Sequence, residues 1–174
     1  MLGNAQTALQ EWDLTQIING KEITSPSPKI YHQKISRKLQ RLLEQYVEKH
    51  DLGEIYNAPL DVILEENVNR LQPDLIFVSH ANRDIIQDWL RGVPDLLVEI
   101  VSKSTFQLDT KEKKEIYEKY GVKEYWIVFP EFKKIEVYQL TKNGYILFNA
   151  ATGTENLKSN MLAGLTFPAS IIFE

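Results

Sequence analysis

The sequence predicts an α/β fold in which helices pack on a central mixed sheet. Three observations lead to this prediction. Two segments repeat apolar residues at helical spacing, and several runs of 5–8 residues rich in Leu, Ile, Val and Phe are bounded by Pro or Gly, as strands are. The order along the chain is helix, three strands, helix, then two or three strands, which favours one layered α/β arrangement.

The first 28 residues carry weak signals. TALQEW fits the start of a helix or a strand, and QIING is strand-like before the turn residues of TSPSP. Residues 30–50 predict a long amphipathic helix, because polar and charged residues separate a helical stripe of apolar ones. The stripe consists of Ile35, Leu39, Leu42, Leu43, Tyr46 and Val47.

Three strands are predicted next, at residues 53–65, 73–79 and 94–101. The polar segment 80–93 between the last two favours an antiparallel hairpin with a long loop. A second helix follows at 110–120. Asp109 and Glu112 predict a capping box at its start, and Gly121 predicts a left-handed stop at its end.

The last third predicts more strands. EYWIVFP and KIEVYQL fit a hairpin, YILFNA fits a shorter strand, and the tail ends with the apolar TFPASIIF. The chain has 174 residues, of which 43% are hydrophobic, so residues 1–174 are expected to form a single domain with a real core.

Composition limits the function. A net charge of −4 and a pI near 5.5 argue against general coating of nucleic acid, although a nuclease with an acidic cleft is still allowed. Without cysteine there is no disulfide framework or thiolate metal site. We find no signal peptide and no membrane-spanning apolar run, so we expect a cytoplasmic protein with no membrane partner.

Two carboxylates fall in predicted core strands, Asp74 in PDLIFVS and Glu99 in PDLLVEIVS. Burying an unpaired carboxylate is expensive, so two of them brought together by the hairpin imply a cation, either a metal ion or a lysine. Asp95 shares a strand face with Glu99 and is kept as a candidate catalytic residue. Four residues separate the two by roughly 13 Å, so Glu99 is the better partner for Asp74.

The helix at 110–120 carries four lysines. Lys111, Lys114 and Lys119 have glutamates at i,i+4 spacing and fit a solvated face. Lys113 instead shares the inward stripe of Ile116, Tyr117 and Tyr120. Its ammonium is expected either to reach the Glu99 strand or to extend to the rim of the helix.

The pattern of motifs resembles a known family. PDLLVEIVSKST is followed by D-x-x-x-K-x-x-x-Y-x-x-x-G-V, EYWIVFP and an EVY strand, and preceded by ING, SPSP and PLDVIL. Over residues 16–140 this is similar to the Uma-type family of predicted restriction-endonuclease-like proteins. The resemblance implies the PD-(D/E)XK nuclease superfamily, whose mixed sheet is flanked by helices.

The resemblance implies roles for individual residues. Asp74 matches the first acid of the superfamily pattern and Glu99 the second. Val101 stands where the lysine is usual, which implies that the lysine has moved to the next helix as Lys113, with Lys103 a weaker alternative. Gln16 and Lys21 stand where relatives often have glutamate, and Glu22 would have to substitute.

The same resemblance implies a cofactor and a partner. The carboxylates of Asp74 and Glu99 and the carbonyl of Ile100 would hold Mg²⁺ or Mn²⁺, and Lys113 would steer the nucleophile or neutralise phosphate. DNA is the expected partner, and a homodimer would serve cleavage of both strands. For His32, His80 and Tyr117 we expect structural positions, with a role in catalysis as the alternative.

Three functions therefore stay open at this point. The first is a metal-dependent endonuclease that hydrolyses DNA phosphodiester bonds. The second is a catalytically silent nuclease relative that binds DNA or protein. The third is a structural ion-pair cluster in a protein with another purpose.

Overall fold

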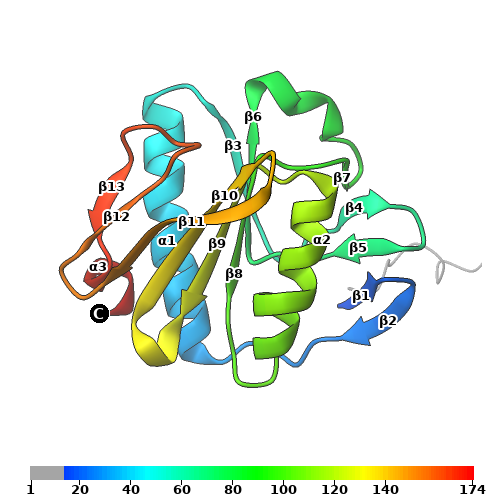
Figure 1. Cartoon of the computed structure of the whole chain (residues 1–174), viewed down its shortest axis with the longest axis horizontal. Coiled ribbons are helices and arrows are strands. Elements are labelled where there is room, and N and C mark those ends of the chain that lie inside the picture. Colours follow the sequence, from blue (N-terminus) through cyan, green and yellow to red (C-terminus); the bar gives the residue numbers. More distant parts are fainter. Residues whose placement is uncertain (1–13) are drawn as a thin grey trace, which may run out of the picture.

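The computed structural model describes residues 14–174 (Figure 1). Its centre is a six-stranded sheet in the order β11-β10-β9-β8-β6-β3. Only β8 and β9 run parallel, so the sheet is mixed and the predicted α/β class is confirmed. Its strands are β3 (Gly53–Asn57), β6 (Leu75–Ser79), β8 (Leu96–Ile100), β9 (Glu124–Phe129), β10 (Lys134–Thr141) and β11 (Gly144–Thr152).

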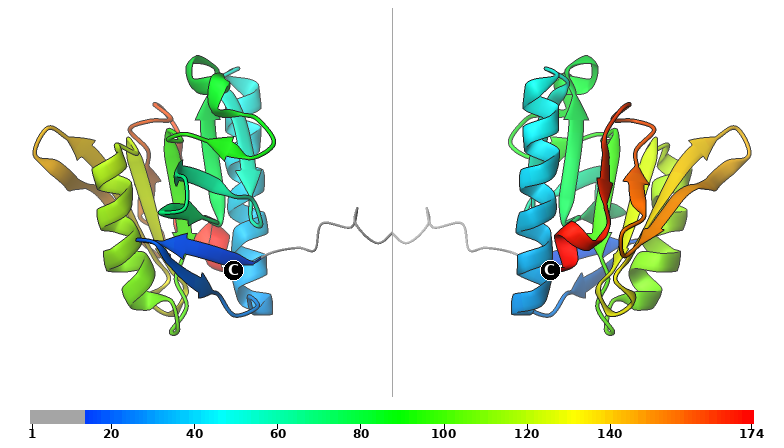
Figure 2. Two further views of the ribbon diagram at one scale, coloured as in Figure 1. Left: turned by 90° about the vertical axis from the view of Figure 1, so that its right-hand side faces the viewer. Right: turned by 90° about the vertical axis from the view of Figure 1, so that its left-hand side faces the viewer.

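Each face of this sheet is covered by different elements, as the side views in Figure 2 show. One face packs on α1 (Ile30–Lys49), α3 (Ser170–Phe173) and the small pair β12 (Asn156–Lys158) and β13 (Thr166–Pro168). The other face packs on α2 (Lys113–Tyr120) and a second sheet. That second sheet has the order β2-β1-β5-β4-β7 and consists of β1 (Thr15–Ile18), β2 (Lys21–Thr24), β4 (Val62–Glu65), β5 (Asn69–Leu71) and β7 (Leu90–Arg91).

The helical stripe of α1 forms as its spacing predicts. Its fully buried residues are Ile35, Leu39, Leu43 and Val47, and they pack on the apolar face of β6, β8 and β9. In residues 14–174, no helix combines the length and the apolar character that crossing a membrane requires.

The predicted strand 53–65 is wrong, because it divides into β3 and β4, which lie in different sheets. Pro59 has no N–H to continue the ladder, so the chain leaves the large sheet there. The amide of Ala58 still donates to the carbonyl of Asp74, at 3.1 Å. β11 is longer than the predicted YILFNA strand, and TALQEW lies outside the described residues.

The predicted capping box at Asp109 is also wrong. Helical backbone begins at Phe106 and passes through a π-helical turn, Leu108–Glu112, before α2. Asp109 is thus inside the helical segment, and its side chain is buried instead of capping backbone amides. The predicted stop is confirmed, because Gly121 has φ 92° and its amide donates to Tyr117 O at 3.1 Å.

Candidate active site

Asp74 and Glu99 meet because β6 and β8 pair antiparallel. Leu75 faces Val98 in the register, so the pair one step further is Asp74 and Glu99, and both point to the face that α2 covers. The amide of Ile100 donates to Asp74 Oδ2 at 2.7 Å. This bond fastens the Asp74 carboxylate to the end of β8.

Lys113 enters the site from α2. Its ammonium lies 2.9 Å from Glu99 Oε1 and 3.2 Å from Asp109 Oδ1, and its side chain is only 4% exposed. The hydroxyl of Tyr117 donates to the same Glu99 oxygen at 2.8 Å. Lys113 and Tyr117, four residues apart on one helix face, thus converge on Glu99, and Asp109, four residues before Lys113, contacts the lysine. The structure places Lys113 inward, one of the two positions expected for it.

His32 closes the site from the first turn of α1. Its Nε2 lies 3.3 Å from Asp74 Oδ1, and both side chains are 17% exposed. Burial lowers the pKa of His32, but the Asp74 carboxylate and the Ile100 backbone outweigh burial, and the net shift is upward. We call the five residues Asp74, Glu99, Asp109, Lys113 and His32 the charged cluster.

The charged cluster has three carboxylates but only one lysine, and burial together with this imbalance raises the pKa of its buried carboxyl groups. Burial, supported by the neighbouring Asp109 and Asp74, raises the pKa of Glu99 to about 8. Burial also raises the pKa of Asp109. For Lys113, burial acts to lower the pKa, but the carboxylates of Glu99 and Asp109 raise it overall, so the lysine stays charged. Proton uptake by carboxyl groups therefore relieves the excess negative charge.

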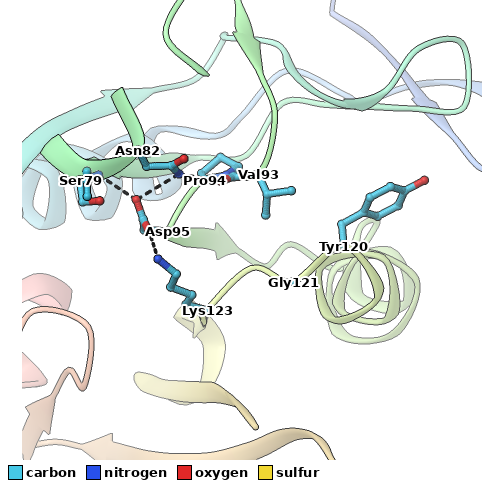
Figure 3. Close-up of a pocket in the computed structure, with 9 residues that line it drawn as sticks. Ser79, Asn82, Val93, Pro94, Asp95, Tyr120, Gly121 and Lys123 are labelled. Atoms are coloured by element: carbon cyan, nitrogen blue, oxygen red, sulfur yellow. Dashed lines mark hydrogen bonds and ion pairs between the residues drawn. The ribbon is translucent and has the colours of Figure 1, made fainter. Parts of the chain in front are cut away.

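Asp95 does not join this cluster. It lies at the opposite end of β8, beside a shallow cavity of about 220 Å³ (Figure 3). Its carboxylate receives Lys123 Nζ at 2.6 Å, the Ser79 amide at 2.8 Å and Asn82 Nδ2 at 3.2 Å. Burial would raise the pKa of Asp95, but the Lys123 and Ser79 bonds lower it. These contacts fit an anchor for the chain ends of β6 and β9.

Other candidates also lie away from the charged cluster. Lys103 is 85% exposed and pairs with Glu131, and Glu22 is exposed on β2. His80 pairs with Asp51 at an exposed position. Gln16 is buried and accepts a bond from the Gln72 amide at 2.9 Å, so it joins β1 to the segment before Asp74.

The outward lysines of the helical segment 106–120 follow the prediction except at one position. Lys111 and Lys119 are exposed, but Lys114 is half-buried, with its ammonium 3.4 Å from the Tyr138 ring centroid. A cation over an aromatic face gains an attraction that water does not fully replace. Lys113 is therefore the one lysine of this helix whose ammonium is held by buried carboxylates.

Sequence reasoning underrated two members of the cluster. The capping-box pattern predicts a cap at Asp109, although Asp109, Lys113 and Tyr117 stand at i,i+4 intervals and must share a helix face. That spacing could have revealed it. For His32 the local signal is its place on the inward side of α1, in line with Ile35 and Leu39, but its contact with Asp74 is set by the tertiary structure.

A mixed sheet that carries two acids on adjacent strands, with a buried lysine beside them, defines the class of restriction-endonuclease-like α/β proteins. The chain belongs to the Uma2 family, described as "Putative restriction endonuclease", whose model matches residues 7–170. The family predicted from the motifs is therefore confirmed. No curated protein matches the chain.

Solved structures show the same fold. The chain is similar to "a putative nuclease belonging to DUF820" from Anabaena variabilis, with 16% identity, TM-score 0.75, and 91% of this chain and 89% of that chain covered. The likeness confirms the restriction-endonuclease-like fold. The type IIG restriction endonuclease BpuSI is also similar, with 11% identity, TM-score 0.46, and 88% of this chain and 17% of that chain covered. That second similarity is too weak to support an argument.

Proposed function

We propose that this protein is a metal-dependent endonuclease that hydrolyses phosphodiester bonds in DNA, with Asp74, Glu99 and Lys113 as its catalytic residues. The observation that carries the proposal is the ammonium of Lys113, 2.9 Å from Glu99 Oε1 in a buried site. Val101 occupies the strand position where the superfamily has its lysine, and a helix supplies the cation instead. Burying a lysine among several carboxylates carries a large desolvation cost, which is unusual for a group with a purely structural role.

The residues present fit a divalent cation. Asp74, Glu99 and the Ile100 carbonyl would offer only oxygen ligands, which Mg²⁺ and Mn²⁺ prefer. His32 supports this fit, because a side chain with a raised pKa already lies against Asp74 and the Ile100 backbone, where a cation is favoured. In residues 14–174 no three His, Asp or Glu side chains converge as a metal group, so the proposed set depends on the backbone carbonyl.

The bound ion would supply Lewis acidity toward a phosphate oxygen and a water of lowered pKa. Asp74 is held for this role by the Ile100 amide on Oδ2, which leaves Oδ1 to face His32 or a ligand. Within residues 14–174, no donor bonds the second oxygen of Glu99, Oε2, since Lys113 and Tyr117 both use Oε1. One oxygen of each acid is thus suited to a cation.

Lys113 can act directly on the substrate. An ammonium has three N–H donors, of which Glu99 Oε1 accepts one at 2.9 Å, while Asp109 Oδ1 forms an ion pair with the ammonium at 3.2 Å. A remaining donor would bind a phosphate oxygen or orient the attacking water. Because the lysine keeps its charge, it would stabilise the negative charge that develops on phosphorus in the transition state.

The test is ion binding measured together with cleavage. Calorimetric titration with Mn²⁺ should show binding to the natural protein and none to Asp74→Asn or Glu99→Gln, and supercoiled plasmid should be cut only when the ion binds. Asp84→Asn is the matched control, because Asp84 is an exposed acid outside the cluster. Equal Mn²⁺ binding by all four proteins would exclude the proposed ligands.

A second function is favoured by one observation. Both oxygens of Asp74 and Oε1 of Glu99 already have partners within the protein. This fits a silent relative that binds DNA or protein without cutting. Mn²⁺ binding without any cleavage of single-stranded or duplex DNA would favour this second function.

We propose further that residues 1–174 form one domain, because both hydrophobic clusters pack on the two faces of the same six-stranded sheet. A cytoplasmic location and a homodimer that cuts both strands remain predictions. Sedimentation velocity with and without a duplex would test the dimer.

A further inference from the structure

Three phenylalanines form a partly exposed cluster at the carboxyl-terminal end of β9. Phe106 and Phe129 have ring centroids 6.3 Å apart at 51°, and Phe129 and Phe132 are 6.4 Å apart at 58°. Phe132 is 67% exposed and Phe106 42% exposed, while Phe129 packs against the core on the α2 face. We call these three residues the phenylalanine cluster.

The phenylalanine cluster lies at the same end of the molecule as the charged cluster. Phe129 ends β9 two residues after Ile127, the parallel partner of Glu99. Phe106 begins the helical segment that carries Asp109 three residues later and Lys113 seven residues later. In Figure 1 the start of this helix and the turn after β9 both lie at the lower edge of the sheet. The two clusters therefore share one edge of the fold.

The surroundings of the phenylalanine cluster favour a nucleic acid over an apolar partner. Lys133 is exposed and next to Phe132, and Lys103 extends with 85% exposure from the loop before Phe106. Lys103 pairs with Glu131 at 3.3 Å, but an exposed pair of this kind is weak, so a phosphate can replace it. Exposed aromatic rings between lysines are the combination that binds stacked bases and their backbone.

We propose that the phenylalanine cluster is a stacking platform for unpaired bases, and that the nuclease acts on single-stranded DNA or on locally unpaired strands. This inference rests on the proposed function, because the bound DNA strand is taken to run from the phenylalanine cluster toward the proposed catalytic site. The bases stack on Phe106 and Phe132, the phosphates contact Lys103 and Lys133, and the backbone continues toward Lys113. In a duplex the bases are paired and cannot cover the rings.

The experiment compares affinities for two oligonucleotides of the same sequence, one single-stranded and one duplex, by fluorescence anisotropy in EDTA so that nothing is cut. Phe132→Ala and Phe106→Ala should each weaken single-strand binding by about 5- to 150-fold, since stacking one base on a ring contributes about 1–3 kcal/mol. Duplex binding should change less than twofold. Phe148→Ala is the matched control, because Phe148 is 40% exposed on β11, outside the cluster.

Salt dependence gives a second measurement. Lys103→Gln and Lys133→Gln should each reduce the slope of log affinity against log salt for the single strand by about 0.7, the value for one phosphate contact on a single strand. The proposal is overturned if the protein binds no single strand, if the phenylalanine variants weaken both ligands equally, or if Phe148→Ala has the same effect as Phe132→Ala. A change in sedimentation on Phe132→Ala without loss of binding would identify a protein interface and also overturn it.

The outcome separates this inference from the nuclease proposal. Single-strand binding that depends on the phenylalanine cluster, without cleavage in Mg²⁺ or Mn²⁺, would support the platform and contradict the nuclease. Cleavage that is unchanged in Phe106→Ala and Phe132→Ala would support the nuclease and contradict the platform.

Discussion

Glu99 and Glu124 are both buried carboxylates on adjacent strands, yet their surroundings differ in kind. Glu124 is 1% exposed and accepts four neutral donors, from the side chains of Trp126 and Ser159 at 2.6 Å each and from the amides of Asn160 and Met161 at 2.8 Å each. These bonds hold the 159–162 segment against β9. Four neutral donors thus satisfy both oxygens of the Glu124 carboxylate.

Glu99 is 3% exposed, but it shares one buried lysine with Asp109 and lies close to Asp74. A surplus of carboxylates raises the pKa of Glu99 to about 8, because burial and like charges both oppose its ionisation. The comparison teaches that a buried carboxylate with hydrogen-bond donors on both oxygens has a structural role. A buried carboxylate with too few donors indicates a site for a further cation.

The largest expected effect is on cleavage. Lys113→Met keeps most of the apolar stem but removes the charge beside Glu99, so we expect cleavage to fall by about 100-fold or more, the range for losing one electrostatic contact to a transition state. Plasmid nicking in Mn²⁺ measures it. Lys111→Met, on the exposed side of the same helical segment, should keep full activity. An active Lys113→Met protein would remove Lys113 from the chemistry.

The next effect distinguishes Glu124 from Glu99 by the free energy of unfolding that each loses on substitution by Gln. Glu124→Gln puts an amide group where two donors point, so the free energy of unfolding should fall by about 2–4 kcal/mol. Glu99→Gln keeps an acceptor for Lys113 and Tyr117 and removes a carboxyl group whose ionisation burial opposes. We therefore expect the free energy of unfolding to fall by less than about 1 kcal/mol at pH 7. Urea unfolding measures both. Equal losses would mean that Glu99 is as structural as Glu124.

The pH dependence of stability follows from the raised pKa of Glu99. Between its ordinary value of 4.5 and its folded value of about 8, the folded protein binds more protons than the unfolded chain. The free energy of unfolding in EDTA should therefore fall as the pH rises through this window. Lys113, whose pKa is raised, stays charged on both sides of it and adds no slope.

Denaturation series at pH 5, 6, 7 and 8 would check this, with Glu99→Gln as the matched variant. The slope of the variant should be shallower, and Glu124→Gln should keep the slope of the natural protein. Stability that increases from pH 5 to 8 would contradict the assigned protonation of the charged cluster.

The smallest effect concerns Tyr117, which donates to Glu99 at 2.8 Å from a fully buried position. Tyr117→Phe should lower the free energy of unfolding by about 1 kcal/mol, the net contribution of one hydrogen bond. Cleavage should fall less than in Lys113→Met, because no charge is lost. Loss of cleavage equal to that of Lys113→Met would give the tyrosine a direct role.

The sequence by itself determined the local elements and half of the site. The 3.6-residue period defined α1 and placed Lys113 inward, and the long polar loop between two apolar runs brought Asp74 beside Glu99. Gly121 ended the second helix as expected. These features depend on residues within a few turns or on one hairpin, so short-range spacing carries them.

The tertiary structure alone decided the rest. The i,i+4 spacing puts Asp109 and Lys113 on one helix face, but the burial of both against Glu99 depends on how the helical segment, which begins at Phe106, packs on the sheet. His32 meets Asp74 only when α1 packs across the sheet, and Glu124 is saturated only when residues 159–161 fold back on β9. These contacts join residues 35 or more positions apart, and no local period or cap encodes such a distance.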